Sequence, residues 1–136
     1  MARRVLRSLP ILTLAALGCQ VGTRLKHFTP AHGPAGVATE IQLRQQRPHL
    51  SGELLAVGDS VLFVLRDGQR VVAVSYGAIA RASFRQLGTW SSAGEPPDSA
   101  LAQQLGRVSR YPQGMSADLL ARLLSAHAQT DVDRVP

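Results

Sequence analysis

The feature that most constrains the fold is a series of short, closely spaced strand patterns between residues 36 and 86. From Val37 to Leu43 apolar and polar side chains alternate, which is the period of a half-buried β-strand. Four more apolar runs follow, and turn residues separate them. The five strands predicted in this way cover residues 37–43, 53–57, 61–65, 71–76 and 79–85. Asp67-Gly68 favours a two-residue hairpin, because that reversal needs positive φ angles.

Five short strands joined by tight turns would leave exposed edges in a flat sheet, and closure into a small bent barrel removes them. A Gly-Glu-Leu-Leu strand at 52–55, a turn led by Asp59, a hydrophobic strand, a hairpin and a Val-x-Val-x-Tyr strand ending at Tyr76 follow one another. This order resembles an Sm-like or SH3-like barrel over residues 36–86, through strand spacing rather than a specific motif. A β-sandwich fragment or an open meander would show nearly the same periodicity.

Two helices are expected near the C-terminus, and their apolar stripes need a packing partner. Asp98 or Ser99 can cap the first helix, and Ser116 can cap the second. Leucines recur at helical spacing in both, at Leu101, Leu105, Leu119, Leu120, Leu123 and Leu124. The fold class predicted is therefore mainly β with C-terminal helices (α+β), a five-stranded antiparallel SH3-like or Sm-like barrel followed by a helical hairpin. The hairpin either packs on the barrel or offers a groove or dimer surface.

The N-terminus has the features of an export signal. Three arginines precede an uncharged stretch from Ser8 to Gly18. That stretch is shorter than the roughly 20 apolar residues needed to span a bilayer, but it matches the apolar core of a signal peptide. Small residues precede Cys19, and this resembles the lipobox of bacterial lipoproteins. The family pattern has leucine three residues before the cysteine, whereas this chain has Ala16 there and Leu17 after it.

The resemblance implies that Cys19, the only cysteine, carries a lipid after cleavage. A lone thiol in an oxidising compartment has no disulfide partner, and acylation removes that liability. The alternatives are a buried thiol in a core helix or removal by the ordinary signal peptidase. In families with this signal an aspartate after the cysteine favours inner-membrane retention. Gln20 at that place therefore implies the periplasmic face of the outer membrane.

The expected organisation follows from these patterns. The ranges are a signal peptide at 1–18, a flexible tether at 19–35, a small β-barrel at 36–88, a linker at 89–97, a helical hairpin at 98–128 and a tail at 129–136 that should fray.

The charge balance does not favour nucleic acid as a partner. The whole chain has a formal charge of +6, but three of its arginines lie in the leader. From Cys19 onward twelve basic residues face nine acidic ones, without a basic run. Proteins that follow phosphate backbones cluster their positive charge. Membrane attachment through Cys19 and an envelope protein or cell-wall partner are expected instead.

One tetrapeptide, Gly58-Asp59-Ser60-Val61, resembles the Gly-Asp-Ser-Leu block of secreted esterases. That family implies a serine nucleophile, an Asp-x-x-His element and an asparagine in the oxyanion hole. Here Leu124 stands three residues before His127, and the chain has no asparagine. A hydrolase using Asp59, Ser60 and His127 is therefore an alternative hypothesis, and a turn is the simpler reading.

Metal binding and catalysis are not expected. His27 and His32 are five residues apart, without the further ligands that a metal site needs. No cofactor motif occurs. The function predicted is a non-catalytic binding or structural role in the cell envelope. A ring-forming or nucleic-acid-binding Sm-like barrel is a further alternative, and the oligomeric state stays open.

Overall fold

The computed structural model describes residues 35–45 and 49–136. The elements in chain order are β1 Ala38–Leu43, β2 Leu50–Val57, β3 Val61–Arg66, β4 Arg70–Ser75, the 3-10 helix η1 Tyr76–Ala78, β5 Ile79–Phe84, β6 Gly88–Ser91, α1 Ser99–Val108, α2 Ala117–Ala126 and β7 Asp133–Val135.

Local signals in the sequence are confirmed where the structure describes them. β1 alternates exposed and buried residues along its whole length, as its period of two predicts. Asp67 and Gly68 have φ angles of 52° and 69°, so the β3–β4 reversal uses the positive φ that the pair favours. Asp98 caps α1 and Ser116 caps α2, each accepting a hydrogen bond from the backbone three residues on.

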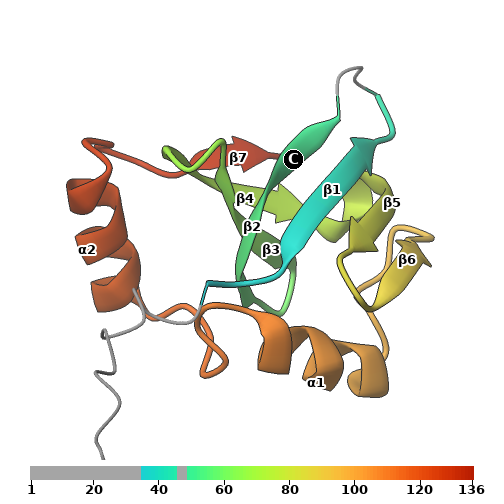
Figure 1. The fold of residues 1–136 in the computed structure, drawn as a ribbon. Helices are drawn as coiled ribbons and strands as arrows, with labels where there is room; N and C mark the ends of the chain where they lie inside the picture. Colours follow the sequence, from blue (N-terminus) through green and yellow to red (C-terminus); the bar gives the residue numbers. More distant parts are fainter. Residues whose placement is uncertain (1–34, 46–48) are drawn as a thin grey trace, which may run out of the picture.

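The predicted five-stranded antiparallel barrel is wrong. The strands form an open, mixed sheet of seven in the order β6-β5-β1-β2-β3-β4-β7 (Figure 1). β4 pairs with β7 in parallel and β5 pairs with β1 and β6, so no hydrogen-bonded ring closes. Two short strands that the sequence analysis assigned to a linker and a fraying tail extend the sheet at its two ends. The fold remains mainly β with C-terminal helices.

Apolar side chains cover both faces of the central strands. In β2 the consecutive residues Leu54 and Leu55 are fully buried, but they belong to different core clusters. The first cluster contains Leu105 of α1, and the second contains Leu123 and Leu124 of α2. The expected helical hairpin is therefore not a unit that packs on one surface, because its two helices complete two separate cores. Figure 1 shows α1 below the sheet and α2 at its side.

A compact ion-pair junction holds the start of the described domain. The Glu53 carboxylate of β2 accepts two hydrogen bonds from the Arg110 guanidinium, at 2.7 and 2.5 Å, and one from the Gly36 backbone N–H at 2.5 Å. Gly36 lies so close to the sheet that an added Cβ would be 1.9 Å from the Leu54 carbonyl oxygen. The junction therefore ties together β2, the chain after α1 and Gly36, the residue that follows the predicted tether.

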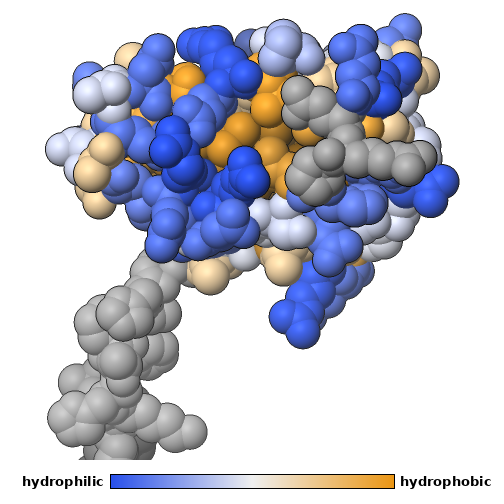
Figure 2. Space-filling view, turned by 90° about the horizontal axis from the view of Figure 1, so that it is seen from above, coloured by the Kyte–Doolittle hydropathy of each residue, from blue (hydrophilic) through white to orange (hydrophobic). Residues whose placement is uncertain are grey.

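Figure 2 shows the face that looks upward in Figure 1, with apolar residues visible at its centre and polar side chains around them. At the C-terminal end of the chain a hollow of about 110 Å³ is lined partly by Leu43, Ala78 and Val135. Among the helices of the described residues, none is long and apolar enough to cross a membrane.

Candidate functional site

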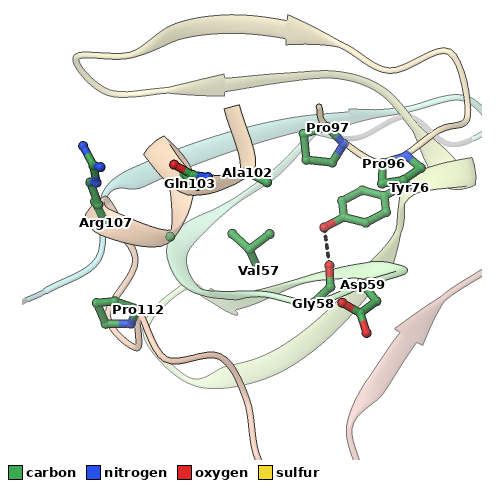
Figure 3. Close-up of a pocket in the computed structure, with 11 residues that line it drawn as sticks. Val57, Gly58, Asp59, Tyr76, Pro96, Pro97, Ala102, Gln103, Arg107 and Pro112 are labelled. Atoms are coloured by element: carbon green, nitrogen blue, oxygen red, sulfur yellow. Dashed lines mark hydrogen bonds between the residues drawn. The ribbon is translucent and has the colours of Figure 1, made fainter. Parts of the chain in front are cut away.

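A groove of about 540 Å³ lies between the β2–β3 turn and α1 (Figure 3). Its walls come from segments far apart in the sequence. The residues that line it are Val57, Gly58, Asp59, Tyr76, Pro96, Pro97, Ala102, Gln103, Gly106, Arg107 and Pro112. Three prolines form part of the rim, and their locked φ angles restrict the backbone there.

Local structure explains how the groove is built. The Gly58 N–H donates to the Val61 carbonyl at 2.9 Å, which closes the turn that carries Asp59. Pro96 and Pro97 lead directly into the Asp98 cap of α1. Within α1 the groove residues Ala102 and Gly106 are small, so the helix leaves space beside the sheet.

Tyr76 closes one end of the groove and is 2% exposed. Its hydroxyl donates to the Gly58 carbonyl at 2.6 Å, and its ring meets Trp90 edge-on at 6.0 Å between centroids. Burial, and secondarily the nearby Asp59 carboxylate, raises the pKa of Tyr76 to about 12. The phenol therefore stays neutral at physiological pH and holds the turn as a hydrogen-bond donor.

The groove carries opposite charges at its two ends. Figure 3 shows Asp59 beside Tyr76 and Arg107 at the other side, with Gln103 between them and Val57 below. Asp59, Gln103 and Arg107 are exposed. A carboxylate, an amide and a guanidinium over an apolar floor suit non-covalent recognition of an extended polar chain.

The structure does not bring the hydrolase candidates together. Ser60 is exposed beside the β2–β3 turn, and its neighbour Val61 pairs with Ser75 at the end of β4. His127 ends α2, and Gln129 two residues later hydrogen-bonds to Val71 near the start of β4. Four residues of extended strand separate these ends by about 13 Å. Asp59, Ser60 and His127 therefore do not form a nucleophile, base and orienter arrangement.

The other residues singled out in the sequence lie outside the described range. They are Cys19 with its lipobox, His27 and His32. Within residues 35–45 and 49–136, no three His, Cys, Asp or Glu side chains are grouped as a metal site would require.

No protein-family model, curated protein or solved structure matches this chain. The description of the groove therefore depends on the residues that line it and on their contacts in this structure alone. Sequence reasoning missed most of it, since Tyr76 was expected as the end of a strand and Pro96-Pro97 as part of a linker. The Asp59 turn was the one signal that pointed to this end of the sheet.

Proposed function

We propose that this protein is a lipid-anchored protein of the bacterial cell envelope, with a non-catalytic binding role. In this proposal Cys19 carries the lipid after cleavage of residues 1–18, and the groove binds an extended peptide segment of an envelope protein. The observation that carries the binding role is the pair of opposite charges, Asp59 and Arg107, at the two ends of one groove.

The charges and the apolar residues of the groove favour a peptide with complementary side chains. A basic side chain would face Asp59 and an acidic one would face Arg107, with a small apolar residue over Val57 and Ala102. The Gln103 amide can donate to and accept from a peptide backbone. Since both charges are exposed, each ion pair would add only about 0–1 kcal/mol, and the apolar contacts would supply the rest.

The anchor is tested by growing cells with labelled palmitate. Cys19→Ala should abolish incorporation, and label retained on that variant would contradict the anchor. Gln20→Asp is the matched control at the neighbouring position. It should keep the label and, if the sorting rule of the family applies, shift the protein towards the inner membrane.

The groove is tested by crosslinking in the native envelope. A photo-reactive residue replaces Gln103 in the groove and, as a control, the exposed Ala121 on α2. A partner bound in the groove should crosslink from position 103 and not from 121. The crosslink should weaken with Asp59→Asn plus Arg107→Gln, and keep its full yield with Asp118→Asn plus Arg122→Gln on α2. A crosslink insensitive to both pairs would contradict the groove as the binding site.

A further inference from the structure

A second hollow, of about 560 Å³, lies where the predicted tether reaches the domain. Its lining joins the first described residues to the β5–β6 turn and the end of α1. These residues, here called the basal face, are Ala35, Gly36, Val37, Ala38, Arg85, Gln86, Leu87, Arg107, Val108 and Ser109.

The charge of the basal face is positive. Arg85 and Arg107 are both exposed, and neither takes part in the ion pairs found among the described residues. No acidic residue lines this hollow. Glu40 shares a neighbouring hollow with Arg85, and the Glu53 carboxylate, which accepts a hydrogen bond from the Gly36 N–H, is paired with Arg110.

The basal face also carries an exposed leucine. Leu87 is 38% exposed and is the one large apolar side chain exposed in the part of the chain that the structure describes. It sits at the tip of the β5–β6 turn, after Gln86 with its φ of 71°. Elsewhere the described large apolar side chains are at least partly buried, so this one stands out against its surroundings. Arginines beside an exposed leucine suit a membrane interface, where guanidinium groups meet lipid phosphates and the leucine enters the headgroup region.

We infer that the domain rests on an anionic lipid surface through this basal face, with Arg85 on a headgroup phosphate and Leu87 inserted beside it. Arg107 lies where the basal face meets the groove and adds positive charge at the edge of this contact. The inference depends on the proposed lipid anchor. Fifteen residues lie between Cys19 and Ala35, and even a fully extended chain over these sixteen steps spans at most about 58 Å. The anchored lipid thus keeps the domain close to the bilayer, with the basal face at the end of the tether.

The contribution of the two arginines to membrane binding can be estimated. A basic residue at an anionic surface contributes roughly a five-fold increase in the membrane-bound population. Removing both arginines should therefore lower that population about 25-fold. Arg85 does not line the groove, so Arg85→Gln alone should weaken membrane contact about five-fold and leave the peptide crosslink from Gln103 unchanged.

The test uses the lipidated full chain in vesicles of phosphatidylcholine, with or without an equal part of phosphatidylglycerol. A nitroxide is attached to Leu87→Cys, where the introduced cysteine is the only free thiol once Cys19 is acylated. Ala121→Cys on α2 is the control. In anionic vesicles the label at 87 should be shielded from a water-soluble relaxing agent and open to oxygen, and the label at 121 should be open to both. Arg85→Gln plus Arg107→Gln should abolish the difference, whereas Arg122→Gln plus Arg134→Gln should not.

The outcomes separate this inference from the anchor. A protein that incorporates palmitate but shows equal water access at 87 and 121 overturns the basal face as a membrane contact and leaves the anchor intact. Equal shielding of 87 in neutral and anionic vesicles overturns the role of the two arginines. A protein without palmitate refutes the anchor, and the inference falls with it.

Discussion

Tyr76→Phe removes a single oxygen from the groove and tests how Tyr76 holds the β2–β3 turn. The lost hydrogen bond to the Gly58 carbonyl is 2.6 Å long and joins η1 to the turn. A neutral hydrogen bond of this kind contributes about 1 kcal/mol, and a carbonyl left without a partner in a dry site costs about 1–3 kcal/mol. Gly58 lines the open groove, so water can reach its carbonyl. We therefore expect a loss of about 1 kcal/mol near neutral pH.

The pH dependence gives the same substitution a second readout. The pKa of Tyr76 is raised to about 12 in the folded protein, mainly by burial, from an ordinary value of 10.0. The folded state therefore holds its proton more tightly than the unfolded state, so this stabilisation is complete below about pH 10 and declines as pH rises towards 12. The phenylalanine variant has no such decline. The roughly 1 kcal/mol advantage of the wild type should vanish near pH 11 and reverse above it.

The assay is urea unfolding of the full chain across this pH range, with Tyr111→Phe in both proteins so that only one phenol differs. Absorbance of the phenolate follows the titration directly. A wild-type advantage that stays constant from neutral pH to about pH 11 would refute the reasoning. So would a Tyr76→Phe variant as stable as the wild type near neutral pH.

Three further predictions concern stability. Gly36→Ala should destabilise the domain by about 1–3 kcal/mol in urea unfolding, because the added Cβ would lie 1.9 Å from a backbone oxygen of β2. Gly106→Ala should instead stabilise α1 by about 0.5–1 kcal/mol, since the atom nearest to the added Cβ is 3.9 Å away. Equal effects of the two substitutions would contradict the close approach at Gly36. Asp98→Ala removes the cap of α1 and should lower stability by about 1 kcal/mol, with Asp98→Asn restoring most of it. Hydrogen bonds from Arg70 hold the pKa of Asp133 below 3.8, so the pair should stabilise the fold above about pH 4 and lose that effect on further acidification. The wild-type advantage over Asp133→Asn should shrink accordingly in urea unfolding at falling pH, and an advantage that grows on acidification would contradict the pairing.

The candidate site shows why sequence reasoning reached only part of it. Asp59 was recognisable because a Gly-Asp-Ser turn after an apolar run has its own local chemistry. Arg107 and Pro112 belong to α1 and the turn that follows it, and nothing in the intervening sequence indicates that α1 returns to the β2–β3 turn. The functional role of these residues exists only once the chain brings them together.

Local interactions were determined by the sequence itself. Interactions between residues at most a few positions apart can be predicted from the sequence. They set the alternation in β1, the Asp67-Gly68 reversal and the Asp98 and Ser116 caps. The adjacent leucines Leu54 and Leu55 were read from the sequence as part of a barrel strand, and only the structure shows that both are buried, on opposite faces of the sheet.

Tertiary structure alone decided which strands are neighbours and which face each helix covers. β7 has three residues and no periodicity of its own, and it pairs with β4 only because α2 returns the chain to that edge, where Gln129 binds the Val71 backbone. Once β7 occupies the edge of β4, the sheet extends instead of closing. Pairings of this kind depend on contacts between segments distant in sequence. The entropy lost on closing the loop between two segments and the free energy gained when they pair cannot be deduced from either segment alone.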